Sequence, residues 1–373
     1  MRVAKNREGT DIDPFTEDGF AELQTLIGKE KELVSDHNRE VTRDNIRRFA
    51  LGSGDDNPIW IDGEYAKRSR WKGIIAPPCF MRTLGEPLPE SLPDVHSQFV
   101  GEEFRLEQPI RLNDDIKATF YLSDIIKKAS RLYGQILLEY KESKYTNQRK
   151  EVFHYRRTYM RHHRLEGETA PSTVKPAYWK PDEIIKFEES RLNEERRGAT
   201  PRYWEEVTVG EELPVRIRGP LTLEDIIWHL IGEGGSNWAY GIGMSYKLKQ
   251  ADPAVYLVNS QGAWETASAA HWDWEVAKRI GAAGPYDILG MRSTSICNML
   301  TDWAGDDGWI KRLSVETRGF MILGDVVFYK GKVTGKYRNG QEGIVKLEIS
   351  GDNQRNERTT NAQAEVQLPV KAG

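Results

Sequence analysis

The chain has 373 residues, a net charge of −4 and 29% charged residues. This length allows about two to three domains, and the balanced charge argues against a nucleic-acid binder, which needs a basic face. No apolar run approaches the roughly 18 to 20 residues of a membrane span, and the N-terminal residues lack the apolar region of a signal peptide. We therefore expect a cytoplasmic protein that binds neither nucleic acid nor membrane.

Two cysteines are present, Cys79 and Cys297. This count supports neither a disulfide framework nor a thiolate metal site, and it suits a reducing compartment. We therefore expect no metal, and no nucleotide-binding loop stands out from the rest of the sequence.

The first ordered segment lies at residues 17–26, where apolar side chains recur at helical spacing until Gly28 ends the pattern. A second helix begins after Thr42, whose side chain can cap the first turn. Thr222 repeats this start in the second half of the chain. Each half therefore opens with a capped helix.

A longer similarity follows these helix starts. Residues 62–68 and 273–279 share five of seven residue types at an offset of 211 positions, and the same offset carries Gly73 onto Gly284. We interpret the chain as one unit that was duplicated and then diverged. Each copy is long enough to bury its own core.

Runs of alternating apolar residues follow in both halves and predict antiparallel strands. They span residues 104–106, 116–122, 133–140 and 153–160 in the first half, and 313–317, 326–333, 343–349 and 364–368 in the second. Before the second set, apolar residues at helical spacing over residues 293–303 predict a helix buried against the sheet.

Two segments fall outside the repeat. An insertion of 31 residues, at about residues 232–263, is rich in Gly, Tyr and Trp and is either a pocket wall or a plain surface excursion. Residues 166–203 are rich in Pro, Lys and Glu and form a natural linker. The expected domains are therefore residues 1–165 and 204–373.

The stretch Ser-Gly-Asp-x-Asn-Pro-x-x-x-Asp at residues 53–62, followed by Tyr-Ala and Gly-x-Ile-Ala, resembles the hydratase-2 pattern of MaoC-like (R)-specific enoyl-CoA hydratases and (3R)-hydroxyacyl dehydratases. The likeness covers about residues 17–165 and 204–370. It implies an α+β fold, a tandem (double) hot dog in which two antiparallel sheets each wrap a central helix. It also implies a FAS1-like dehydratase domain that holds the substrate, followed by a catalytic MaoC-like domain.

The resemblance further implies reversible addition of water to a trans-2-enoyl thioester, a reaction of fatty-acid metabolism such as β-oxidation. In the family an Asp and a His five residues later activate the water, and a backbone N–H near the central helix polarises the thioester carbonyl. Positioned acid and base groups typically contribute about 100- to 10,000-fold. Losing one oxyanion donor costs roughly 3 kcal/mol.

The first half departs from this pattern twice. Asp55 matches the family carboxylate, but Trp60 occupies the position of the histidine. Pro78 stands where the family has the glycine donor, and proline has no N–H. The stretch around Asp55 can therefore also be read as only a turn and helix cap.

The second half restores the histidine as His271. If the alignment with the family pattern is shifted by one residue, Glu265 falls at the position of the carboxylate. A shift of one residue likewise places Gly290 at the position of the glycine N–H donor. We therefore expect a catalytic set of His271, Glu265 and the Gly290 N–H, with Asp55 as a further candidate. The alternatives are a structural histidine and a glycine hinge at a helix start.

Several further residues are candidates for substrate binding in this reading: Asn57, Trp60, Trp264, Trp272 and Arg292. The tryptophans can line an acyl pocket or serve only as core. Arg292 can instead pair with Asp287 as a structural contact.

The leading hypothesis is a hydro-lyase acting on an enoyl-CoA, with no cofactor beyond the CoA of the substrate. The alternatives are an acyl-CoA thioesterase and a non-catalytic acyl-binding subunit. A homodimer and a heteromer with another hot-dog subunit are both compatible with the resemblance.

Overall fold

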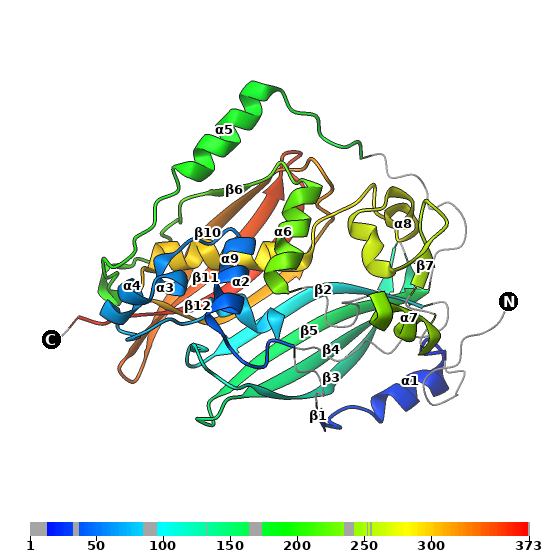
Figure 1. The fold of residues 1–373 in the computed structure, drawn as a ribbon, viewed down its shortest axis with the longest axis horizontal. Coiled ribbons are helices and arrows are strands. Elements are labelled where there is room, and N and C mark those ends of the chain that lie inside the picture. Colours follow the sequence, from blue (N-terminus) through cyan, green and yellow to red (C-terminus); the bar gives the residue numbers. More distant parts are fainter. Residues whose placement is uncertain are drawn as a thin grey trace.

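A computed structural model describes residues 13–32, 37–84, 95–131, 133–163, 174–234, 242–251, 253 and 256–371. Over these residues, one antiparallel sheet of ten strands forms the body of the molecule, in the order β1-β3-β4-β5-β2-β9-β12-β11-β10-β6 (Figure 1). The strands of the first half are β1 (Lys31–Glu32), β2 (Val95–Leu106), β3 (Lys117–Ser130), β4 (Gly134–Thr146) and β5 (Val152–His163). Those of the second half are β6 (Arg216–Arg218), β9 (Trp309–Thr317), β10 (Val327–Asn339), β11 (Glu342–Asn353) and β12 (Arg358–Leu368).

The strand order repeats outward from the centre of the sheet. β2, β5, β4, β3 and β1 follow one another on one side, and β9, β12, β11, β10 and β6 occupy the matching places on the other. The two half-sheets join where β2 pairs with β9, from Gly101 opposite Glu316 to Arg105 opposite Arg312. This symmetry agrees with the duplication inferred from the sequence.

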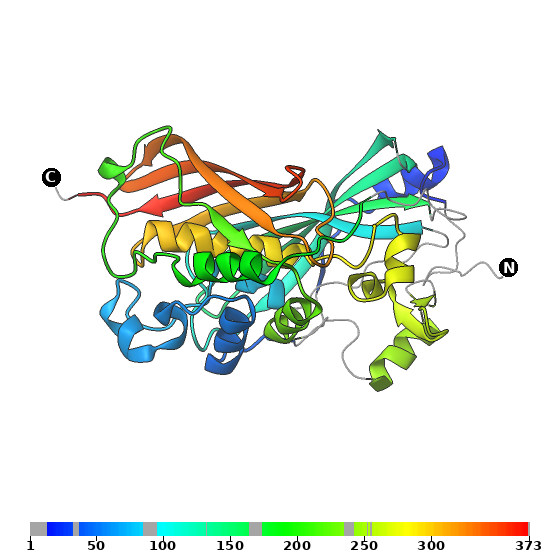
Figure 2. The ribbon, with the colours of Figure 1, turned by 90° about the horizontal axis from the view of Figure 1, so that it is seen from above.

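Most of the helices lie on one side of the sheet, whereas α1 lies apart from them beside β3 (Figure 2). All helices of the described residues follow in chain order. They are α1 (Glu17–Gln24), α2 (Arg43–Gly52), α3 (Pro58–Ile61), α4 (Gly63–Arg68), α5 (Pro181–Leu192), α6 (Leu223–Glu233), α7 (Ile242–Ala251), α8 (Trp274–Arg279) and α9 (Leu289–Ala304). Short 3-10 helices are η1 (Pro78–Thr83), η2 (Trp204–Glu206) and η4 (Ala267–His271), and a separate hairpin consists of β7 (Tyr256–Val258) and β8 (Trp264–Thr266). None of the helices described is long and apolar enough to cross a membrane.

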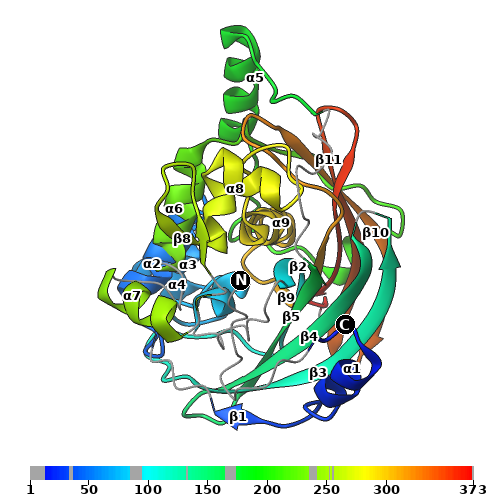
Figure 3. The same cartoon turned by 90° about the vertical axis from the view of Figure 1, so that its right-hand side faces the viewer.

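α9 is the central helix, and the sheet curves around it (Figure 3). Ile296, Met299 and Leu300 are at most 1% exposed, and the helix ends where Gly305 adopts a φ of 75°. The expected helix at residues 293–303 is therefore confirmed and begins four residues earlier. Its counterpart at the repeat offset is η1, which begins at Pro78 and spans only six residues.

Both capped helix starts are also confirmed. The side chains of Thr42 and Thr222 each accept a hydrogen bond from the backbone three residues on, and each forms a capping box. The two helices, α2 and α6, cross at Gly52 and Gly232. A Cβ on Gly52 would lie 2.6 Å from the Cα of Gly232, so the crossing requires glycine.

One hydrophobic cluster spans both halves, where the sequence had suggested a core for each. Residues of both halves meet in it, for example Trp71 and Trp309, whose rings are 5.4 Å apart.

Helix α5 of the linker has no buried residue and stands away from the body of the molecule (Figure 1). The linker is held by ion pairs, since Arg196 contacts both Asp56 and Asp302.

Candidate active site

The first-half stretch lies in the core. Asp55 is 4% exposed, and its carboxylate accepts hydrogen bonds from the Asn57 backbone at 3.0 Å and from the Trp60 indole at 2.9 Å. Burial raises the pKa of Asp55 to about 6, although both donors oppose the shift. The indole of Trp60, at the sequence position where we expected a histidine, thus holds the carboxylate.

A small cavity lies beside two of these residues, Asn57 and Trp60. Asn57 is buried and caps α3 by accepting from the Ile59 backbone at 3.1 Å. A cavity of about 10 Å³ lies among Asn57, Trp60 and Trp71, which is room for about one water. Asp55, Asn57 and Trp60 therefore have clear structural roles, and no substrate group fits in that cavity.

His271 ends η4 in the second half, and its Nδ1 lies 2.9 Å from the backbone oxygen of Tyr286. A carbonyl oxygen only accepts, so Nδ1 carries the proton and Nε2 carries a lone pair. Burial lowers the pKa of His271, while the Tyr286 carbonyl and Asp287 oppose the shift. The ring is therefore a neutral imidazole that can accept a proton at Nε2.

Glu265 lies on β8 and contacts other partners. Its carboxylate accepts from Asn259 at 2.8 Å and from the Trp272 indole at 3.2 Å. Trp264, beside it in sequence, is 55% exposed. The structure thus joins two of the expected residues, Glu265 and Trp272. Trp272 directly follows His271 in the chain, but the Glu265 carboxylate has no hydrogen bond to the His271 ring.

Gly290 lies in the first turn of α9, where the first four backbone N–H groups of a helix have no partner within it. A Cβ on Gly290 would lie 2.5 Å from Nε and Nη2 of Arg82, so the guanidinium lies directly against the helix start. The start of α9 therefore combines the positive end of the helix with a neighbouring cation.

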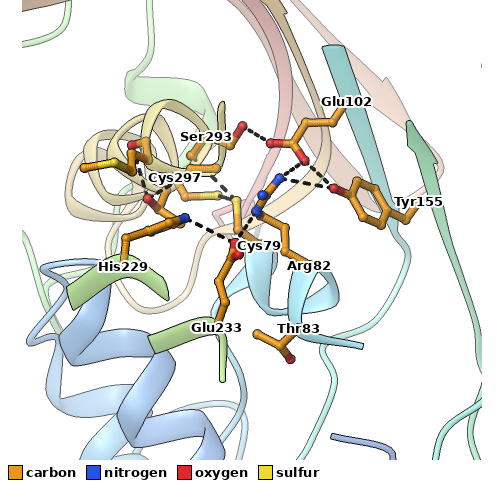
Figure 4. A network of polar contacts seen from close by, with 12 residues as sticks. Cys79, Arg82, Thr83, Glu102, Tyr155, His229, Glu233, Ser293 and Cys297 are labelled. Atoms are coloured by element: carbon orange, nitrogen blue, oxygen red, sulfur yellow. Dashed lines mark hydrogen bonds and ion pairs between the residues drawn. The ribbon is translucent and has the colours of Figure 1, made fainter. Parts of the chain in front are cut away.

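Arg82 belongs to a buried polar network between the halves (Figure 4). Its Nη1 donates to Glu102 on β2 and to the Tyr155 hydroxyl on β5, and its Nε donates to Glu233 on α6 at 2.6 Å. Burial disfavours the charge of Arg82, but the two carboxylates outweigh this effect and raise its pKa well above the ordinary value. The guanidinium therefore stays charged although it is buried.

The network continues toward α9 and α6. Ser293 donates to Glu102, and Nε2 of His229 lies 3.2 Å from Glu233 (Figure 4). Burial opposes the ionisation of Glu233, but Arg82 and His229 outweigh it and lower its pKa to about 2. His229 also lies close enough to His271 to lower the pKa of that imidazole.

The sequence analysis missed this network. Arg82 comes from a short segment whose partners lie on three other elements, so no local pattern pairs them. The available signal was Glu102, which shares the inward phase of β2 with the buried residues Phe104 and Leu106. A carboxylate at a core position of a strand requires a partner.

A pocket of about 540 Å³ opens where the two half-sheets separate. β2 pairs with β9 only from Gly101 onward, and a bulge between Phe99 and Gly101 disrupts the adjoining ladder with β5. Bulges of this kind are common beside active sites. The lining includes cations and aromatic rings: Lys128, Arg156, Arg318, Tyr133, Tyr140 and Phe320.

This pocket lies one side chain away from His271. The ring of Phe320 in its wall is 4.7 Å from the ring of Tyr286, and the Tyr286 backbone accepts a hydrogen bond from the imidazole.

Arg292, expected to bind substrate, is instead 2% exposed. It donates to both oxygens of Asp287 at 2.7 Å and to the Thr359 carbonyl, so it fixes the turn that precedes α9.

The family model described as "FAS1-like, dehydratase domain region" matches residues 26–155. A UPF0336 protein of Thermobifida fusca is 32% identical over 107 residues, which cover 26% of this chain and 69% of that protein. A UPF0336 protein of a Parafrankia species is 30% identical over 110 residues, which cover 27% of this chain and 72% of that protein. The chain belongs to the family of these UPF0336 proteins.

Solved structures share the fold over nearly the whole chain. A MaoC-like dehydratase has a TM-score of 0.63 at 17% identity, over 94% of this chain and 100% of that one. A putative MaoC domain protein dehydratase from Chloroflexus aurantiacus has a TM-score of 0.59 at 13% identity, over 93% of this chain and 96% of that one. A Mycobacterium tuberculosis protein described as having a double hotdog fold has a TM-score of 0.54 at 9% identity, over 92% of this chain and 96% of that one. The double hot-dog fold expected from the sequence is confirmed.

Proposed function

We propose that this chain is a hydro-lyase that reversibly hydrates a trans-2-enoyl-CoA thioester to a 3-hydroxyacyl-CoA. The observation that carries the proposal is the state of His271, a neutral imidazole held at Nδ1 by a backbone carbonyl and able to accept a proton at Nε2. The FAS1-like dehydratase region supports the broader hydratase or dehydratase class.

In the proposed reaction, Nε2 of His271 takes a proton from water while the water oxygen bonds to the β-carbon of the enoyl group. Electrons move onto the thioester oxygen, which becomes an enolate. The imidazolium then returns the proton to the α-carbon, and dehydration follows the same steps in reverse.

The developing enolate needs donors fixed in advance. The Gly290 N–H at the start of α9 takes this role in the proposal, with the positive end of the helix and the Arg82 guanidinium adding to it. The pocket at the opening of the sheet is our choice for the acyl group, because Val100, Leu138 and Met160 line it. The reaction as written uses no cofactor beyond the CoA of the substrate.

The test is turnover by the purified protein of enoyl-CoA thioesters with short, long, branched and aromatic acyl groups, followed by loss of the conjugated chromophore. His271→Ala should reduce the rate by about 100- to 10,000-fold. His163→Ala is the matched control, because its side chain is 53% exposed and it should leave the rate unchanged.

Other outcomes separate the alternatives. Release of free thiol without any hydroxyacyl product indicates a thioesterase. Tight binding of acyl-CoA without turnover across the panel, by a folded protein, contradicts the hydro-lyase and supports an acyl-binding subunit. The mass of the protein in solution, alone and with candidate hot-dog partners, tests the proposed homodimer or heteromer.

A further inference from the structure

The two cysteines of the chain meet inside the shared core (Figure 4). Cys79 lies in η1 of the first half, and Cys297 lies 218 residues later in the middle of α9. Their Sγ atoms are 2.6 Å apart, and the residues are only 1% and 3% exposed. We propose that these two thiols form a disulfide that joins the two halves of the chain.

The geometry favours the bond. Sulfur atoms in a disulfide are about 2.05 Å apart, so a movement of roughly 0.5 Å brings the pair to bonding distance. η1 packs directly on α9, so both backbone segments already lie against each other. The count of two cysteines did not suggest a disulfide; only the fold shows that they are neighbours.

The reaction requires an oxidant, and we assign this role to a low-molecular-weight disulfide such as oxidised glutathione. One protein thiolate attacks it and releases one glutathione, and the second thiolate attacks the mixed disulfide and releases another. The protein pair loses two electrons and two protons, and one oxidised glutathione becomes two reduced molecules.

The bond should form while the chain folds. Burial and the neighbouring Cys297 raise the pKa of Cys79 well above its ordinary value, so the reduced pair in the folded protein holds little of the reactive thiolate. A bound glutathione would also have no room in the closed core. During refolding in a redox buffer the two thiols are still accessible, so the chain can reach either the dithiol or the disulfide form.

The expected consequence is stability. The bond would close a loop of more than two hundred residues and thereby restrict the unfolded chain. It would also hold η1, which carries Arg82, against the helix that carries Ser293. We expect the oxidised protein to melt about 5 °C or more above the reduced protein.

The experiment refolds the denatured, reduced chain in glutathione buffers of increasing oxidising strength. The folded product is then denatured and alkylated, and its mass is measured. We expect no alkylation of the intact oxidised chain, two alkylated sites after reduction, and a crosslinked peptide that contains both cysteines. Two free thiols in every buffer would overturn the proposal, as would mixed glutathione adducts or dimers between chains.

The variants Cys79→Ser, Cys297→Ser and the double Ala variant supply the controls. The melting difference between oxidised and reduced samples should vanish in all three. If the difference persists in the double variant, it does not come from this bond. The readouts are thiol state and melting temperature, so the test is independent of the proposed enzymatic function.

Discussion

Single side chains distinguish the two halves of the repeat. At equivalent positions the first half has Trp60 and the second half has His271. The sequence could identify this difference because the repeat fixes the alignment. It could not predict that the Trp60 indole donates to Asp55, or that Glu265 contacts Trp272, because these contacts depend on how loops fold.

The state of His271 predicts how the proposed activity depends on pH. Its ordinary pKa is about 6.5, and burial lowers it. A general base works when it is unprotonated, so kcat/KM should decrease at acid pH. The midpoint of this decrease should lie below pH 6.5. A pH profile measured with an active enoyl-CoA checks this, and an acid limb centred above 6.5 contradicts the assignment to His271.

The raised pKa of Asp55 predicts a stability effect. The folded carboxyl has a pKa of about 6, against about 3.9 when unfolded, so the folded state binds more protons between these values. This contribution to stability is present below pH 3.9 and is lost as pH rises through 6. Over that window it amounts to about 3 kcal/mol.

The measurement is urea unfolding of the natural protein and of Asp55→Asn at pH 4 and pH 7. The free energy of unfolding of the natural protein should fall by about 2 kcal/mol, relative to the variant, between these two values. If the difference in free energy of unfolding between the natural protein and Asp55→Asn is the same at pH 4 and pH 7, Asp55 does not titrate between these values.

For helices and strands, the sequence predicted where each element lies better than it predicted how long the element is. Both helix caps and the central helix were correct, because capping residues and apolar spacing are local signals. The strands run longer than expected: β3 continues to Ser130, past the apolar residues that marked it. Backbone pairing needs no apolar side chain, so strand ends cannot be read from hydrophobic alternation alone.

The crossing of α2 and α6 gives a prediction at this scale. Gly52→Ala or Gly232→Ala would force the two backbones apart and should destabilise the protein by about 1 to 3 kcal/mol. Gly243→Ala is the matched control: that helical glycine has nothing within 4 Å of an added Cβ, and the change should be neutral or slightly stabilising. Denaturant midpoints compare the three variants.

For the whole molecule, the buried network connects parts that the sequence presents as separate. Arg82 and Glu102 belong to the first half, and Glu233 and Ser293 belong to the second. The duplication implied two similar units, but it could not show that they share one core. Contacts between distant segments are a property of the assembled sheet.

Arg82→Ala tests how much this network contributes. The change leaves two carboxylates buried without their cation and should destabilise the fold by about 3 to 5 kcal/mol. Lys67→Ala removes an exposed pair with Glu64 and should cost less than about 1 kcal/mol. Unfolding curves decide, and similar losses in both variants would contradict a stabilising role for the network.

Helix α5 buries no residue, so the peptide bonds within it add nothing to the interior. The gene could therefore be divided there. Two separately translated polypeptides would retain every core contact and should recombine into a heterodimer of the same shape.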